Sequence, residues 1–191
     1  MFFINILLYL IRSNECDGSI RCTFTSQEVT ISGTTFSDLS SGSKEGGALY
    51  IDNCEVSVFG STFVNCKSST KGGAVYCQQS ASHTFSVKDC IFEKCTAFDG
   101  GGIFYKQSLT SNDEINNCVF KECKATGIGG GVFFESNGGS IVDCEFTSCE
   151  AEFNGGSLTY WNVAKQSESG IVQRCIFDSK LSLYNPNLLY T

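Results

Sequence analysis

The cysteines are the residues in this sequence whose number and spacing could support chemistry. The chain of 191 residues contains 12 cysteines, and Cys-x4-Cys recurs as Cys90/Cys95, Cys118/Cys123 and Cys144/Cys149. Zinc sites favour closer pairs whose ligands converge on one ion, whereas a phenylalanine separates the two thiols in each pair here. We therefore interpret these cysteines as buried thiols that act as small apolar side chains, with disulfide bonds or metal binding as alternatives. No metal site and no cofactor is predicted.

The cysteines belong to an internal repeat that covers most of the chain. Its clearest marker is a phenylalanine that recurs every 26 to 31 residues, as Phe36, Phe63, Phe92, Phe120, Phe146 and Phe177. Five positions before each phenylalanine stands a β-branched residue, and two positions before it stands Thr, Ser or Cys. Further along the first five units, a pair of glycines precedes an aliphatic residue, as in Gly72-Gly73-Ala-Val75. So many coincident columns establish a true repeat.

The composition of the repeat predicts short strands rather than helices. Runs such as Val56-Ser-Val58 and Phe85-Ser-Val87 alternate apolar and polar residues, which is the period of a half-buried strand. A unit this short cannot bury its apolar face alone, whereas stacked copies can, so a solenoid is expected. Propeller blades need about 40–45 residues, and the Leu-x-x-Leu-x-Leu pattern of leucine-rich repeats is absent. The sequence therefore predicts an all-β fold, a single-stranded parallel β-helix of about six coils of 26–31 residues.

Like residues in successive coils stack about 4.8 Å apart, which places whole columns inside the solenoid. We expect the phenylalanine column in the interior, flanked by two cysteine ladders whose main members are Cys90, Cys95, Cys118, Cys123, Cys144 and Cys149. Disulfides between stacked cysteines are borderline, because parallel side chains keep the Cβ atoms near this spacing, beyond the usual range of about 3.5–4.5 Å. Cys16 and Cys22 lie outside the ladders and are the best candidates for a disulfide pair. On the surface, Glu93 should stack on Lys121 and Lys94 on Glu122.

Few residues are available for acid–base or phosphate chemistry. The chain has one histidine, and its net charge of −7 repels a phosphate backbone, so nucleic acid is not an expected partner. Asp89 and Asp143 occupy one column, but they would lie about 10 Å apart, which is long for the carboxylate pair of a retaining glycosidase. His83 is interpreted as an incidental surface residue. No catalytic residue is predicted.

A column of aromatic residues beside the aliphatic column is the candidate ligand-binding site. It comprises Tyr50, Tyr76, Phe104 and Phe133, and the period of two places these side chains on the outer face. An exposed aromatic ladder would suit stacking against sugar rings or an aromatic-rich partner. The alternative is that a long loop, 105–114 or 134–139, folds over the column and buries it.

The paired motifs resemble those of known β-helix repeat proteins. Cys90-Ile-Phe92-Glu-Lys-Cys95, followed by Gly100-Gly101-Gly-Ile-Phe104, is similar to the repeats of chlamydial polymorphic outer-membrane proteins, in which Phe-x-x-Asn alternates with Gly-Gly-Ala-(Ile/Leu/Val). Comparable repeats occur in surface proteins of protist parasites. The resemblance spans residues 29 to about 180, although cysteine mostly replaces the Asn column. It implies a right-handed, pectate-lyase-like β-helix with a surface or secreted, adhesin-like role, and it carries no catalytic residue.

The ends of the chain bear on its location. Residues 1–15 contain an apolar run that predicts a signal peptide or an N-terminal cap and is too short for a membrane span of about 20 residues. Residues 16–180 form the predicted β-helix, and 181–191 a tail or an incomplete final coil. We expect a non-catalytic, secreted or cell-surface protein that binds a carbohydrate or a host or cell-surface protein. The alternative is a polysaccharide-cleaving lyase or glycosidase, which rests on analogy of fold alone.

Overall fold

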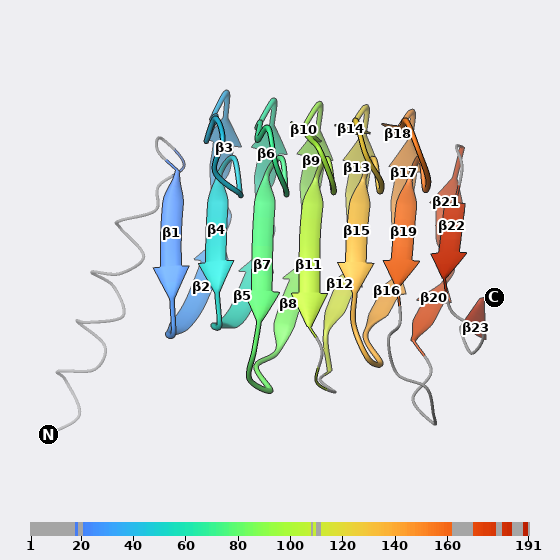
Figure 1. The fold of residues 1–191 in the computed structure, drawn as a ribbon. Helices are drawn as coiled ribbons and strands as arrows, with labels where there is room; N and C mark the ends of the chain where they lie inside the picture. Colours follow the sequence, from blue (N-terminus) through green and yellow to red (C-terminus); the bar gives the residue numbers. More distant parts are fainter. Residues whose placement is uncertain are drawn as a thin grey trace, which may run out of the picture.

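Each repeat of the sequence forms one turn of a parallel β-solenoid in the computed structural model, and successive turns stack along one axis (Figure 1). The structure describes residues 18, 21–107, 109, 112–161, 170–178, 181–184 and 189–190. These residues form strands and turns, without a helix, in about five turns of solenoid, which confirms the predicted all-β, right-handed parallel β-helix. Residues 1–15, predicted to be a signal peptide or a cap, lie outside the described residues.

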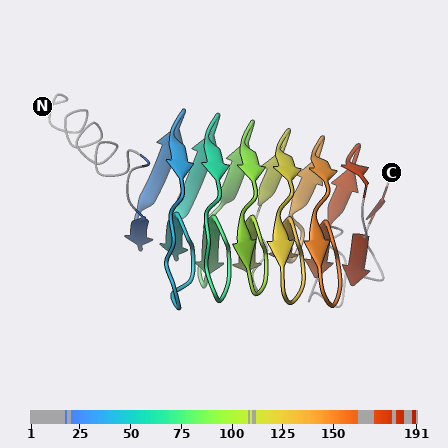
Figure 2. The same cartoon turned by 90° about the horizontal axis from the view of Figure 1, so that it is seen from above.

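Four parallel sheets run along the solenoid, and each strand pairs with its equivalent in the next turn (Figure 2). Sheet 1 contains β1 (Cys22–Thr25), β4 (Leu49–Asp52), β7 (Val75–Gln79), β11 (Ile103–Gln107), β15 (Val132–Glu135), β19 (Leu158–Trp161) and β22 (Leu181–Tyr184). Sheet 2 contains β2 (Glu28–Ser32), β5 (Glu55–Phe59), β8 (Phe85–Lys88), β12 (Glu114–Asn116), β16 (Ser140–Val142), β20 (Ile171–Gln173) and β23 (Leu189–Tyr190). Thus β22 and β23 continue both sheets into the segment predicted as a tail or incomplete coil.

The other two sheets are made of shorter strands. Sheet 3 contains β3 (Thr35–Ser37), β6 (Thr62–Val64), β9 (Ile91–Glu93), β13 (Val119–Lys121), β17 (Glu145–Thr147) and β21 (Ile176–Phe177). Sheet 4 contains β10 (Thr96–Ala97), β14 (Lys124–Ala125) and β18 (Glu150–Ala151). After sheet 4 the chain forms an outer loop and returns to sheet 1 through the glycine pair.

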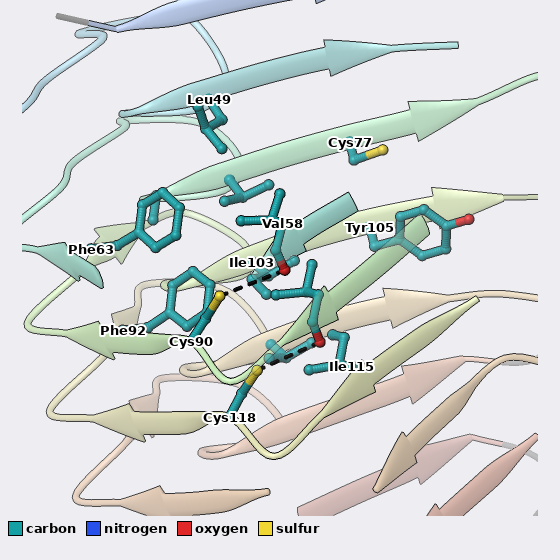
Figure 3. Close-up of a cluster of buried hydrophobic side chains, with 14 of the residues drawn as sticks. Leu49, Val58, Phe63, Cys77, Cys90, Phe92, Ile103, Tyr105, Ile115 and Cys118 are labelled. Atoms are coloured by element: carbon teal, nitrogen blue, oxygen red, sulfur yellow. Dashed lines mark hydrogen bonds between the residues drawn. The ribbon is translucent and has the colours of Figure 1, made fainter. Parts of the chain in front are cut away.

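The phenylalanine column is the centre of the core. The six rings stack in register along sheet 3, with neighbouring centroids 4.7–4.9 Å apart and planes within 3–13° of parallel. The first five are fully buried, and Phe177 at the end is half-buried. Figure 3 shows Phe63 and Phe92 beside Val58, Ile103 and Ile115, which belong to the predicted β-branched and aliphatic columns. The predicted core is therefore confirmed.

A second aromatic column in the core was not predicted. Ile51, Cys77, Tyr105, Phe134 and Tyr160 pair in register on the inner face of sheet 1, and all are buried. The ring of Phe85, from sheet 2, stacks on Tyr105 with a centroid distance of 4.4 Å. The sequence does not reveal this column because it changes residue type along the solenoid, from Ile51 to Cys77 and then to aromatic residues.

Residues in the left-handed backbone conformation end the strands and turn the chain. Between sheets 2 and 3 this position holds Gly33, Gly60, Asp89, Asn117, Asp143 and Arg174, with φ between 50° and 57°. The glycine pairs meet a stricter requirement. Gly100 has φ +64°, and a Cβ on its neighbour Gly101 would lie 2.2 Å from Gly130 O and 2.5 Å from Lys124 O. The first position of the pair thus requires glycine because of its positive φ, and the second requires glycine because backbone atoms leave no space for a Cβ.

The predicted register of the surface charges is confirmed, but the predicted ion pairs between neighbouring turns do not form. Glu93 lies opposite Lys121 in the adjacent strand. The ion pairs form instead between chain neighbours, with Lys94 Nζ 3.1 Å from Glu93 Oε1 and Lys121 Nζ 3.9 Å from Glu122 Oε1. These surface pairs contribute little to stability.

We predict that Phe120→Ala lowers the free energy of unfolding by about 3–5 kcal/mol, because its cavity is walled by Phe92 and Phe146 and cannot close. Phe177→Ala should cost clearly less, since Phe177 is half-buried and stacks on Phe146 alone among the described rings. Urea unfolding monitored by circular dichroism gives both values. Equal, small losses would show that the column does not stabilise the core.

We also predict opposite outcomes for substitutions at two glycines. Gly101→Ala should destabilise the fold by about 2 kcal/mol or more, because backbone atoms block its Cβ. Gly60→Asn should change stability by less than about 0.5 kcal/mol, because the equivalent Asn117 already has this conformation and the space is open. Thermal melts of the two variants test this, and a Gly101→Ala protein as stable as Gly60→Asn would contradict it.

Candidate functional site

The predicted aromatic ladder forms, but most of it is covered. Tyr50, Tyr76, Phe104 and Phe133 pair in register on the outer face of sheet 1, with neighbouring ring centroids 4.7–5.4 Å apart. Tyr76, Phe104 and Phe133 retain only 7%, 3% and 5% exposure, and Tyr50 is half-buried. The expectation of an exposed ladder is therefore wrong: the ladder is covered, as the alternative predicted, but not by the loops that the alternative named.

The cover comes from the outer loops that precede the glycine pairs. Ile128 packs against the ladder, and Lys71 Nζ lies 4.7 Å from the centre of the Phe104 ring. These contacts replace the expected cover by loops 105–114 or 134–139. Burial raises the pKa of the Tyr76 phenol well above its ordinary value, and its hydroxyl donates to Gln78 Oε1 at 2.7 Å. The ladder is thus a second, smaller core that fixes the outer loops on sheet 1.

Arg21 caps the N-terminal end of this ladder. Its guanidinium lies 5.4 Å from the centre of the Tyr50 ring, and Thr23 is the register partner of Tyr50 in the preceding turn. Nε donates to Gly46 O at 2.7 Å, and Nη2 donates to Glu45 O at 2.6 Å. One side chain therefore holds both the first ring and the outer loop beside it.

The column of acidic residues is a polar ladder in which each carboxylate has a partner. Asn117 Nδ2 donates to Asp89 Oδ1 at 2.6 Å. Arg174 donates through Nε and Nη2 to the two oxygens of Asp143, both at 2.6 Å, and this hydrogen-bonded guanidinium lowers the pKa of the Asp143 carboxyl. Within the described residues, no group of three or more His, Cys, Asp or Glu could hold a metal ion. The geometry thus gives this column a structural role.

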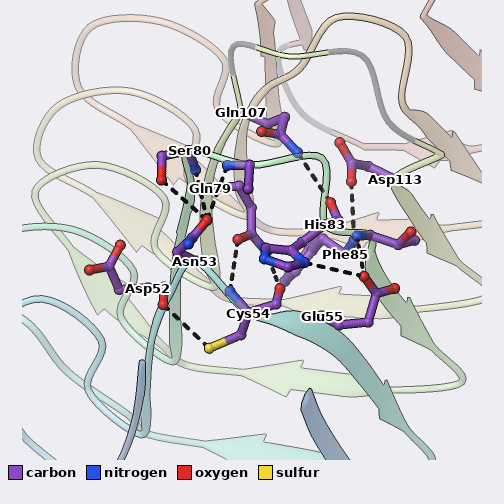
Figure 4. Close-up of polar contacts among 12 residues, drawn as sticks. Asp52, Asn53, Cys54, Glu55, Gln79, Ser80, His83, Phe85, Gln107 and Asp113 are labelled. Carbon is purple, nitrogen blue, oxygen red and sulfur yellow. Dashed lines mark hydrogen bonds and ion pairs between the residues drawn. The ribbon is translucent and has the colours of Figure 1, made fainter. Parts of the chain in front are cut away.

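At the corner between sheets 1 and 2, buried polar side chains form hydrogen bonds with the backbone (Figure 4). The Gln79 amide accepts from Cys54 N at 2.9 Å and donates to Cys54 O at 2.5 Å. Asp113 accepts from Phe85 N at 3.1 Å and from Ser136 Oγ at 2.9 Å. These side chains supply hydrogen bonds to backbone groups that leave the strand ladders. Their buried positions therefore reflect support of the backbone.

His83 lies at the surface of the same corner. Its Nδ1 is 3.7 Å from Glu55 Oε2, and both side chains are partly exposed. Its carbonyl accepts from the buried Gln107 Nε2 at 3.1 Å. The structure places His83 on the surface, as interpreted, and adds an acidic neighbour.

The cysteines of the first ladder are hydrogen-bond donors. Ladder A consists of Cys90, Cys118, Cys144 and Cys175, and the same column begins with Thr34 and Ser61. Each side chain donates to the carbonyl two residues earlier, as Cys90 does to Lys88 O at 3.1 Å and Ser61 to Phe59 O at 3.1 Å. Each thiol also approaches a second carbonyl in the preceding turn, as Cys90 does to Val58 O at 3.7 Å (Figure 3).

Ladder B consists of Cys66, Cys95, Cys123 and Cys149, and it flanks the other side of the phenylalanine column. Its thiols approach the carbonyl of the phenylalanine one turn earlier, at 3.4–3.6 Å. The ten described free cysteines include both ladders and the unpredicted core members Cys54 and Cys77. Cys22 is disulfide-bonded, and Cys16, its predicted partner, lies outside the described residues.

The outer loops carry exposed aromatic residues that the repeat pattern does not predict. Phe98 and Phe153 retain 49% and 72% exposure. They belong to one column with Thr70 and Gly127, because Phe98 N donates to Thr70 O, Gly127 N to Phe98 O, and Phe153 N to Gly127 O. The repeat pattern does not predict these positions because the loops vary in length and composition. We call this column the loop ridge.

Comparisons with protein-family models, with curated proteins and with solved structures give no match. The resemblance to chlamydial and protist repeats therefore rests on the motifs alone. Among the described residues, no helix has the length and apolar character needed to cross a bilayer. The fold and the site geometry thus define a parallel β-solenoid with two thiol ladders, a covered aromatic ladder and an exposed loop ridge.

We predict that the native protein resists alkylation at nine of its ten described free cysteines, because only Cys175 is partly exposed. Burial also raises the pKa of the Cys77, Cys118 and Cys123 thiols well above the ordinary value, which suppresses the reactive thiolate. After denaturation without reductant, these nine thiols should react. Intact mass counts the adducts, and fewer than about four new ones would mean that the ladders are disulfide-bonded, against the geometric expectation.

Proposed function

We propose that this chain is a non-catalytic, secreted or cell-surface, adhesin-like β-helix protein that binds a glycan or a protein partner through its loop ridge. The observation that carries this proposal is the exposure of Phe98 and Phe153 on loops that are otherwise fixed. Exposed aromatic side chains in one column are unusual on a soluble surface and favour contact with a partner.

The loops that carry the ridge are held in place, so binding would require little ordering. Asp99, next to Phe98, accepts from Ile128 N through Oδ1 at 3.1 Å. Thr159 Oγ1 donates to Asn154 O at 3.4 Å beside Phe153. A surface that is ordered before binding loses less conformational entropy on contact. This favours a recognition role for the ridge.

The cysteines support an oxidising location. Cys22 is disulfide-bonded, and stable disulfides are typical of secreted and surface proteins. The buried ladder thiols persist in such a location because oxidation requires an accessible thiolate. The motif resemblance to surface β-helix repeats agrees with this assignment.

A glycan array and a cell-binding assay test the proposal with one pair of variants. Phe98→Ala combined with Phe153→Ala should reduce retention by about tenfold or more, as expected for loss of two aromatic contacts. Phe59→Ala is the matched control, because Phe59 is 44% exposed but lies in β5, on sheet 2. Equal retention of the double variant and the wild type, or an equal loss in the Phe59→Ala control, would contradict the ridge as the binding surface. Polysaccharide incubation with measurement of new reducing ends tests the enzymatic alternative.

A further inference from the structure

The last described pair of ladder A differs from the others in being accessible. Cys144 is buried with 1% exposure, whereas Cys175 in the next turn is partly exposed. Both thiols are free, and each donates to the carbonyl two residues earlier in its own turn. A reagent or ion from solvent can therefore reach this end of the ladder first.

The two sulfur atoms lie one turn apart in equivalent positions. Cys144 Sγ is 3.3 Å from Val142 O and 3.6 Å from Ile115 O, and Cys175 Sγ is 3.4 Å from Gln173 O and 3.5 Å from Ile141 O. Ile176 N donates to Cys144 O at 2.9 Å, so the turns are adjacent here. Equivalent side chains in adjacent turns are separated by the strand spacing, about 4.7–4.9 Å.

This spacing suits a bridging soft metal ion better than a disulfide. A disulfide requires the sulfurs to approach to about 2.05 Å, with the Cβ atoms drawn closer than the stacked turns place them. A metal–thiolate bond is about 2.3 Å long, so two collinear bonds span about 4.6 Å. Soft thiolate ligands select Cu(I), Zn²⁺ and Fe–S clusters, and structural Zn²⁺ sites and Fe–S clusters take four protein ligands, which leaves Cu(I) for a site with two thiolates. The stacked pair therefore matches a linear S–Cu–S unit with little movement of either turn.

We propose that Cys144 and Cys175 form a two-coordinate Cu(I) site at the accessible end of ladder A. On binding, each thiol releases one proton and each resulting thiolate donates one electron pair to the metal. Copper remains Cu(I), no sulfur is oxidised, and the S–Cu–S unit carries a charge of −1. The site needs two ligands only, so it is compatible with the lack of any larger ligand cluster among the described residues.

The residues before the two cysteines have opposite charges that neutralise one another. Arg174 and Asp143 precede Cys175 and Cys144 and form an ion pair with two hydrogen bonds of 2.6 Å. This pair joins the same two turns that the metal would bridge. It therefore keeps the two cysteine backbones in register whether or not the metal is bound.

Anaerobic titration of the full chain with Cu(I), without added reductant so that the Cys22 disulfide stays intact, and in competition with the chelator bathocuproine disulfonate, tests the site. We expect one Cu(I) bound per chain and an X-ray absorption spectrum that fits two sulfur ligands at about 2.2–2.3 Å, close to other metal–thiolate bonds. Cys175→Ser should weaken binding at least 100-fold. The serine can keep the bond to Gln173 O, as Ser61 keeps the equivalent bond to Phe59 O.

Cys118→Ser is the matched control, because it removes a thiol from the same ladder and leaves the Cys144–Cys175 pair intact; it should bind Cu(I) as the wild type does. A readout that needs no variant is protection of Cys175 from N-ethylmaleimide by one equivalent of Cu(I). Absence of binding, binding that survives Cys175→Ser, three or more ligands in the absorption spectrum, or unprotected Cys175 would each overturn the proposal.

Discussion

The hydrogen bonds that join the backbone of each turn to the next are the interaction on which the rest of the structure depends. They continue through the turns as well as the strands, as when Gly72 N donates to Asp99 O and Gly100 N to Ile128 O. Because these bonds run along the axis, each turn must copy the backbone of its neighbour. Side chains at equivalent positions then enter the same surroundings one turn apart. The phenylalanine, thiol and aromatic ladders all follow from this copying.

The repeated backbone restricts the hydrogen bond or conformation that a position must provide, and several residue types can meet the same requirement. Thr34, Ser61 and Cys90 occupy one column because a hydroxyl and a thiol can both donate to the carbonyl two residues earlier. The turn between sheets 2 and 3 accepts Gly60, Asn117 or Arg174 provided that the residue takes a positive φ. A cysteine in ladder A therefore combines the donor of serine with a larger apolar surface for packing against the phenylalanine column.

The sequence predicts the core columns well because their residue types repeat. Phe120, Ile115 and Val132 lie in the columns and the register expected for them. The mixed column of Cys77 and Tyr105 could not be predicted, since its members share a position but no chemical type. The loop that covers Phe104 could not be predicted either. The alternation of apolar and polar residues predicts that this side chain lies on the outer face of the sheet, but not which residues pack over it. The ridge residues Phe98 and Phe153 stand in loops that do not repeat, where column alignment has no power.

The outer loops differ in length, although the turns that carry them are nearly uniform. Four residues separate Ser41 from Gly46, three separate Ala125 from Gly129, and two separate Ala97 from Gly100. The solenoid can therefore absorb insertions and deletions at these loops while the stacked interior keeps its register. Mutations in the outer loops would therefore cost little folding stability, and the exposed loops of duplicated genes could diverge in sequence. A lineage carrying such a protein could thus change the surface it presents without having to evolve a new fold.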